Sequence, residues 1–398
     1  MRAAPLPEGG KVPVRFPFHN GPLWAEALSD LGASLGFSTL ALEVARTGEA
    51  FWVGFFAALG YLTLGPLLLL SPWVERRDLA RALLELRLAR GLLFLPLPFL
   101  PREAALLVLY AYPLMVLTDL AVVAWEGLLV RRGRDRLAER SGKLYAAWEV
   151  GGLVGVGLGP ALFALHPALP YFLAAGILLL AWALLRPALT GEKGEREEAA
   201  RPEALGRSLR RLLAHAPLRP YLLLSLLFTL AHALTTALLG LLALRAGTPK
   251  ALFGLVFVLQ SLGYTLGSYF AGRVPPALAF RLGPLGAALG GMGFLLPFPL
   301  LLAAPPLLGL GVALLSTHLR AVRGWLLPKE GLAPSLAAIR ALLYGAGALG
   351  GLGAGVLGKG NPALPLLVGA LGFLVLLPFA LGPLHPRRLE ALRQEEAE

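Results

Sequence analysis

The chain has 398 residues, 57% of them hydrophobic and 15% charged, which leaves too little polar surface to cover a soluble globular protein of this size. It contains no cysteine, which excludes a disulfide framework and a cysteine-ligated metal. The net charge of +12 lies largely in short connections between apolar stretches, so it indicates contact with anionic lipid headgroups rather than with nucleic acid.

Apolar stretches long enough for a helix to cross a bilayer, about 20 residues, recur along the whole chain. We therefore predict an all-α polytopic membrane protein with twelve transmembrane helices. The predicted spans are Trp24–Ala45, Phe51–Leu70, Leu83–Leu100, Ala104–Trp125, Leu144–Leu165, Leu169–Leu185, Tyr221–Leu244, Ala251–Ala271, Leu282–Pro299, Ala304–Leu319, Leu336–Leu357 and Pro362–Leu381.

Basic residues are distributed unevenly between the two ends of these spans. Most of the 36 Lys and Arg residues lie at the termini and in the even-numbered connections. We assign Arg87 and Arg90 to the second connection. The positive-inside rule then places both termini in the cytoplasm and the connections near Thr47, Arg102, His166 and Thr248 outside. We expect the inner membrane of a bacterium, and the scarcity of Asn, Gln and Met favours a thermophilic one.

A polar segment, Pro187–Pro220, separates the first six spans from the last six. We predict an N-terminal bundle over residues 1–186, a cytoplasmic linker over 187–220 and a C-terminal bundle with a short tail over 221–398. In the linker, Ala204–Ala214 sets leucines against arginines, which predicts either a basic amphipathic helix on the inner leaflet or an unstructured basic linker. The segments Ser71–Arg76 and Ser268–Arg273 follow the second and eighth spans alike, as expected for repeated halves.

Two motifs carry a resemblance to a known family. The connection that contains Glu75, Arg76 and Asp78 resembles the acid–arginine motif between helices 2 and 3 of the major facilitator superfamily. Gly155 and Gly159 followed by Pro160 are similar to the G-x-x-x-G-P motif of its drug:proton antiporters. The chain thus resembles a bacterial efflux transporter of this superfamily, which implies two pseudo-symmetric six-helix bundles with the substrate site between them.

The glycines of that second motif have two interpretations. Gly155 and Gly159 stand one helical turn apart and leave a flat face that a neighbouring helix can approach closely. The face could serve ordinary close packing, or it could serve movement between the two bundles.

A charge at the centre of a bilayer costs about 3 kcal/mol or more, so acidic side chains within spans are functional candidates. The resemblance implies that helices 1, 4, 7 and 10 line the central cavity. The polar residues on these helices that we predict to form a proton and substrate site are Glu26, Asp30, Asp119, His232, Thr235 and Thr236. Glu26 could instead face lipid headgroups, and His232 could be a buried hydrogen-bond partner.

The fourth span contains no arginine, although many proton-coupled exporters have one there, so proton coupling is inferred from the acids alone. We predict an inner gate made by the motif residues Glu75, Arg76 and Asp78 together with Glu149 and Arg340. In this gate Glu75 pairs with Arg340. The alternative is that Arg340 only anchors its helix to lipid phosphates.

The leading functional hypothesis is a secondary active exporter of small amphipathic compounds that works by proton antiport. The first alternative is an importer of a nutrient or metabolite, and the second is a lipid flippase or membrane-embedded enzyme. The chain shows none of the sequence motifs of metal, hydrolase or phosphate-binding sites, so we expect no catalytic residue, metal or cofactor. The expected partners of the monomer are a small-molecule substrate, protons and membrane lipids.

Overall fold

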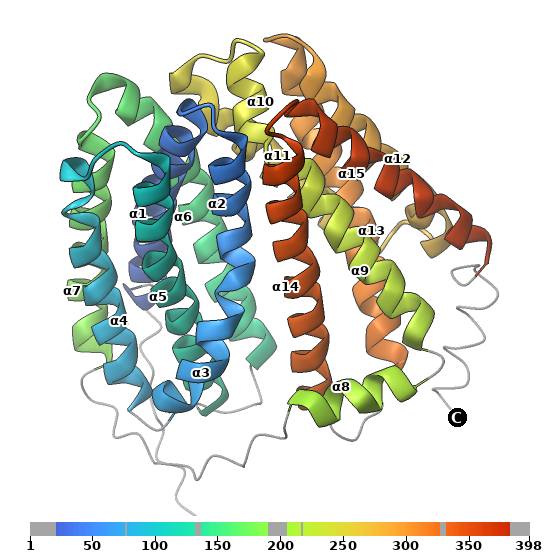
Figure 1. Cartoon of the computed structure of the whole chain (residues 1–398). Helices are drawn as coiled ribbons and strands as arrows, with labels where there is room; N and C mark the ends of the chain where they lie inside the picture. Colours follow the sequence, from blue (N-terminus) through green and yellow to red (C-terminus); the bar gives the residue numbers. More distant parts are fainter. Residues whose placement is uncertain are drawn as a thin grey trace, which may run out of the picture.

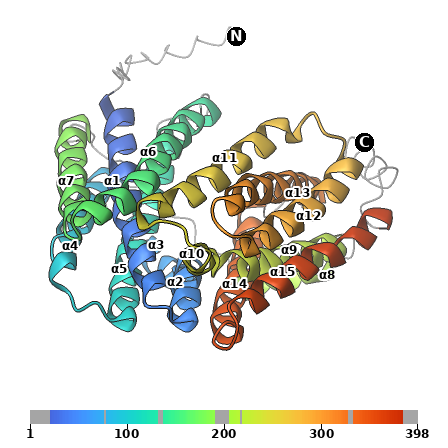
Figure 2. The same cartoon turned by 90° about the horizontal axis from the view of Figure 1, so that it is seen from above.

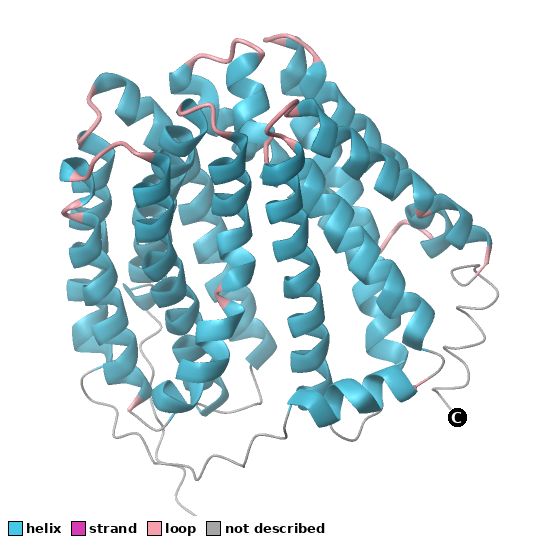
Figure 3. Ribbon diagram, viewed as in Figure 1, coloured by secondary structure: helices cyan, strands magenta, loops and turns pink. Residues whose placement is uncertain are grey.

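The computed structural model describes residues 21–75, 78–131, 137–189, 205–215, 218–326 and 332–382. Over these ranges the chain forms helices and connecting loops without a β-strand (Figure 3). Each of the twelve predicted spans coincides with a helix or with two consecutive helices, so the all-α prediction is confirmed.

The helices of the first half gather on one side of the molecule (Figure 1). They are α1 (Gly21–Arg46), α2 (Ala50–Leu62), α3 (Leu64–Glu75), α4 (Leu79–Phe94), α5 (Ala104–Arg131), α6 (Leu137–Leu165) and α7 (Leu169–Leu189), with a short 3₁₀ turn at Leu97–Phe99. In this half α1 packs against α6 and α7, and α4 packs against α5 and α7. We call this group of helices the N-terminal half.

The helices of the second half form the other side (Figures 1 and 2). They are α9 (Arg219–Thr236), α10 (Leu239–Arg245), α11 (Phe253–Ala271), α12 (Pro276–Met292), α13 (Ala304–Leu326), α14 (Leu332–Leu357) and α15 (Ala363–Val375). Here α13 packs against α11 and α12, and α9 packs against α14 and α15. We call this group the C-terminal half.

Nine helical segments of the described residues are long and apolar enough to cross a membrane. Many large apolar side chains are exposed on the outside of the structure, as expected for a protein surrounded by lipid, for example Leu69, Leu109, Leu349 and Leu371. The helices α1 and α4 are not among the nine, and both carry charged side chains along their length.

The two halves meet along two seams, α2 against α14 and α6 against α11 (Figure 2). In the first seam a Cβ on Gly54 would lie 2.5 Å from the Cα of Gly355, so the two backbones touch. In the second, a Cβ on Gly254 would lie 3.0 Å from the Cα of Gly157. In these seams the second predicted span lies beside the eleventh, and the fifth lies beside the eighth.

The tight contacts of both seams lie toward one end of the molecule. They involve α2 along its length and the second half of α6, whereas α3, which continues α2, packs against α5 and α4. The helix α8 (Leu205–Ala214) lies at the opposite end (Figure 1). The halves are therefore joined most closely at the end remote from α8.

Two sequence predictions are resolved by packing. The amphipathic segment is a helix, α8, but Leu212 is buried against Leu222 of α9 and Ala338 of α14, so its apolar face contacts protein where contact with lipid was predicted. Gly155 and Gly159 lie against the backbone of Leu31 and Leu35 on α1. Their motif therefore packs two helices of the same half, which supports the close-packing interpretation.

Candidate functional site

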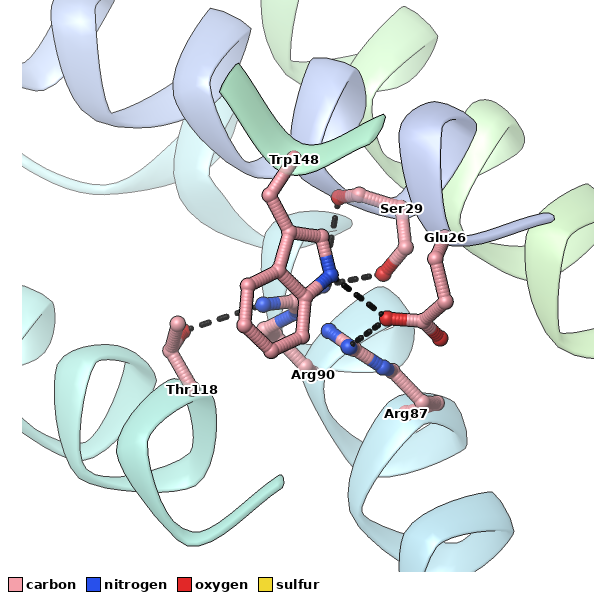
Figure 4. A network of polar contacts seen from close by, with 6 residues as sticks. All are labelled: Glu26, Ser29, Arg87, Arg90, Thr118 and Trp148. Carbon is pink, nitrogen blue, oxygen red and sulfur yellow. Dashed lines mark hydrogen bonds and ion pairs between the residues drawn. The ribbon is translucent and has the colours of Figure 1, made fainter. Parts of the chain in front are cut away.

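A network of buried polar side chains joins α1, α4, α5 and α6 in the middle of the N-terminal half (Figure 4). Nη2 of Arg87 donates to Oε2 of Glu26 over 2.5 Å, and both side chains are almost fully buried. The indole nitrogen of Trp148 donates to the same carboxylate oxygen over 2.8 Å. A buried ion pair is tolerated only where such further hydrogen bonds offset the cost of removing the charges from water.

Arg90 is the second buried arginine of this network, and only 1% of its surface is exposed. Its Nη2 donates to the hydroxyl of Ser29 over 2.6 Å and to the backbone carbonyl of that residue over 3.2 Å. Its Nη1 donates to the hydroxyl of Thr118 over 3.1 Å. The direct hydrogen-bond acceptors of Arg90 are therefore neutral, and its charge is offset by carboxylates at longer range, Asp30 and Glu26.

Asp30 lies one helical turn after Glu26 and interacts electrostatically with both arginines. The hydroxyl of Ser34 lies 3.4 Å from Oδ2 of Asp30. On the facing helix a Cβ at Gly152 would lie 2.7 Å from the same oxygen, so the carboxylate occupies the space that a side chain would need. The absence of a side chain at Gly152 thus lets Asp30 reach the surface of a cavity.

That cavity lies between the two halves and has a volume of about 310 Å³. Its lining residues are Asp30, Tyr145, Trp148, Glu149, Gly152, Leu153, Val156 and Ser261. All but one come from α1 and α6, and Ser261 comes from α11 in the other half. Small-molecule sites are concave, mostly apolar and supplied with a few placed polar groups, which is the character of this lining.

The predicted acids have different positions. Glu26 is buried in the ion pair, so the alternative that it faces headgroups is wrong. Asp30 lines the cavity. Asp119 is half-buried on α5 beside the hydroxyl of Thr63 and within electrostatic reach of Arg340, and it is not part of the cavity lining.

The predicted polar residues of helix 7 do not reach the cavity. The ring of His232 stacks on Phe228 at 6.2 Å between centroids, inside the C-terminal half. Thr235 is fully buried. The hydroxyls of Thr235 and Thr236 each donate to the backbone carbonyl one turn earlier in the same helix. These three residues are not part of the lining of this cavity, and their side chains face the core of their own half or their own helix.

The predicted gate is described only in part. The side chain of Glu75 and the whole of Arg76 lie outside the described residues. Asp78 accepts the backbone N–H groups of Ala80 and Arg81 at 3.0 and 3.4 Å, so it caps the start of α4. Glu149 lines the cavity, and Arg340 lies 3.4 Å from the hydroxyl of Tyr344 and within electrostatic reach of Glu126 on α5.

The arginines of the network were missed from the sequence. Arg87 and Arg90 were counted with the basic connection, although both fall inside the span predicted from Leu83. Two arginines three residues apart within an apolar stretch, in a chain whose first span carries two acids four residues apart, are the signal that could have found this pairing. Arg90 also reaches Thr118, so an arginine from α4 contacts the helix in which the resemblance led us to expect one.

A second charged cluster lies near the end of α1 in the N-terminal half, and the sequence analysis missed it too. Glu43 near the end of α1 accepts from Arg102 over 2.8 Å and from the hydroxyl of Tyr171. The guanidinium of Arg102 also lies 5.8 Å from the ring centroid of Tyr171. This cluster joins the end of α1 and the beginning of α7 to the connection before α5. It contributes no residue to the lining of the cavity.

Solved structures share this fold at low sequence identity. A mutant of the nucleoside transporter NupG aligns with a TM-score of 0.69 at 14% identity over 94% of this chain and 100% of that chain. A bacterial homologue of the human lysosomal transporter Spinster, in an inward-facing and unoccupied conformation, gives a TM-score of 0.70 at 12% identity over 95% and 98%. No family model matches this sequence, and no curated protein matches it at a significant level. The likeness confirms a polytopic membrane protein with the major facilitator fold.

Proposed function

We propose that the protein is a secondary active transporter that exports small amphipathic compounds by proton antiport through alternating access. The observation that carries this proposal is the cavity between the halves, to which one half contributes Asp30 and the other Ser261. A site shared by two bundles changes its access when the bundles rock against each other. Both structural neighbours are transporters, which agrees with this proposal and with the expectation that the protein is not an enzyme.

The orientation follows from the basic residues. If the positive-inside rule holds, the α8 end of the molecule faces the cytoplasm and the tightly joined seams lie on the outer side. The cavity is then closed toward the outside and approached from the cytoplasm, as an exporter needs for loading. We expect a monomer in a bacterial inner membrane.

Proton coupling is assigned to Asp30 and Asp119. Asp30 lies on the cavity surface beside two buried arginines, and Asp119 lies between Thr63 and the cation of Arg340 in the other half. Asp119 can exchange a proton when the halves move, because its distance from the cation of Arg340 then changes, whereas Asp30 can exchange one from the cavity surface. One of the two acids is enough to couple one proton to each cycle.

Reconstitution tests the proposal directly. In liposomes with an imposed pH gradient, the wild-type protein should accumulate amphipathic test compounds, and Asp30→Asn combined with Asp119→Asn should abolish that accumulation while the protein remains folded. Wild-type rates of uphill transport in the double variant would show that these acids do not couple protons.

An importer remains the second candidate, and it is favoured by one structural neighbour, which is a nucleoside transporter. A nucleoside would use its hydroxyl groups to donate hydrogen bonds to Asp30 and Glu149 and could stack on Trp148. Counterflow of radiolabelled nucleosides in liposomes separates the two candidates, since only the importer would exchange them.

A further inference from the structure

The two carboxylates of the cavity differ in their electrostatic surroundings. Asp30 faces Arg87 and Arg90 of α4 as well as the acids Glu26 and Glu149. Within the described part of the chain, Glu149 has neither a hydrogen bond nor an ion pair of its own, and no Lys or Arg lines the cavity with it. The arginines of α4 therefore offset the charge of Asp30. The charge of Glu149 faces the cavity, and no cation among the described lining residues offsets it.

Two aromatic rings stand beside Glu149, and both are held in place. The rings of Tyr145 and Trp148 pack edge to face, with their centroids 5.2 Å apart. Trp148 is fixed by its hydrogen bond to Glu26, and Tyr145 donates from its hydroxyl to Glu126 over 2.9 Å. Aromatic faces beside a carboxylate attract organic cations, because the ring quadrupole and the negative charge act in the same direction.

We propose that this cavity recognises an organic cation, an amine or quaternary ammonium compound with an apolar body, and that Glu149 is its counter-charge with Tyr145 and Trp148 as aromatic walls. This inference rests on the proposed transport function for the site, and it assigns to Glu149 a role in binding in place of gating. The cavity volume of about 310 Å³ is in the range of sites for small molecules. Ser261 supplies the one polar contact from the other half.

A binding experiment with a matched pair of probes tests the charge requirement. Isothermal titration calorimetry in detergent at fixed pH compares benzyltrimethylammonium, which carries a permanent charge, with benzyl dimethylcarbinol, which resembles it in shape and is neutral. The wild-type protein should bind the cation at least about tenfold more tightly. Glu149→Gln should weaken cation binding by about tenfold and leave the neutral probe unchanged, and Glu149→Asp should retain most of the preference.

The control variant is Glu103→Gln, which removes one exposed negative charge at the other end of the molecule and should change neither affinity. Equal affinity for the two probes, or unchanged cation binding in Glu149→Gln, would overturn the inference. A separate result would refute the transport proposal and leave the binding inference intact. If the wild-type protein binds the cation as expected but does not move it in liposomes under a pH gradient, the site stands and the antiport function does not.

Discussion

The two halves of the molecule share a helical plan but differ in what they bury. Every buried Asp, Glu, Lys or Arg side chain of the described residues lies in the N-terminal half, namely Glu26, Glu43, Arg87 and Arg90. In the C-terminal half the described buried polar side chains are hydroxyls: Ser225, Thr235, Thr248, Ser316 and Ser335. Among the described residues, the N-terminal half therefore buries charged side chains, whereas the C-terminal half buries none.

The apolar cores reflect this difference. The C-terminal half has one large cluster of buried apolar residues that extends from Tyr221 on α9 to Leu376. In the N-terminal half two clusters meet where the ion network lies. On α4 one cluster includes Leu86 and the other Phe94, with Arg87 and Arg90 between them. The ion network thus takes the place of continuous apolar packing, and its stability depends on the pairing of Glu26 with Arg87.

The largest expected effect comes from breaking that pairing. Arg87→Ala leaves Glu26 buried without its cation, and we expect the free energy of unfolding to fall by about 3–5 kcal/mol. Thermal unfolding of the detergent-purified protein measures this change. The matched control is Arg81→Ala on the same helix, which removes an exposed ion pair with Glu85 (2.9 Å) and should leave the unfolding temperature nearly unchanged.

The next effect concerns the seam between the halves. Gly54→Val places a side chain where the backbone of Gly355 lies, and overpacking of this kind costs about 1–3 kcal/mol in the closed arrangement. We expect the outer seam to open and transport to fall sharply, which impermeant labelling of a cysteine introduced at Ala50 would detect. Gly60→Val on the same helix is the control, because no atom lies within 4 Å of its added Cβ.

A smaller effect is expected at the cavity. Gly152→Ala adds a methyl group 2.7 Å from the carboxylate of Asp30, which must turn away while the helix remains intact. Transport should show a raised KM by several-fold with unchanged stability, measured on reconstituted protein. Gly176→Ala, whose new Cβ would have no neighbour within 4 Å, should leave KM as it is; a change of the same size there would remove the argument for Asp30.

The smallest effect is expected in the C-terminal half. Nδ1 of His232 is buried without a hydrogen-bond partner among the described residues, and its ring stacks on Phe228. His232→Phe keeps the stack and removes the unpaired polar atom, so the unfolding temperature should stay the same or rise slightly. Loss of transport in this folded variant would show that the C-terminal half also supplies a functional polar group.

Much of the fold follows from the sequence, because apolar length and the distribution of basic residues report helices that cross a membrane. The position of Asp30 also follows, since an acid in the middle of a span needs a functional or paired environment. The pairing of Glu26 with Arg87 does not, because residues 61 positions apart meet only through helix packing. The same is true of Thr235, whose face of α9 could be fixed only by α15 and its Gly369.

The central claim is that the cavity between the halves changes the side from which it is accessible. The chain has no cysteine, so Ser261→Cys gives a single labelling site in the cavity. An impermeant maleimide should label it rapidly from the cytoplasmic side in inside-out vesicles and more slowly in right-side-out vesicles, where Gly54→Val should accelerate labelling because it wedges the outer seam open. No labelling from the outside in either protein, or labelling from the outside that Gly54→Val does not alter, would contradict alternating access at this site.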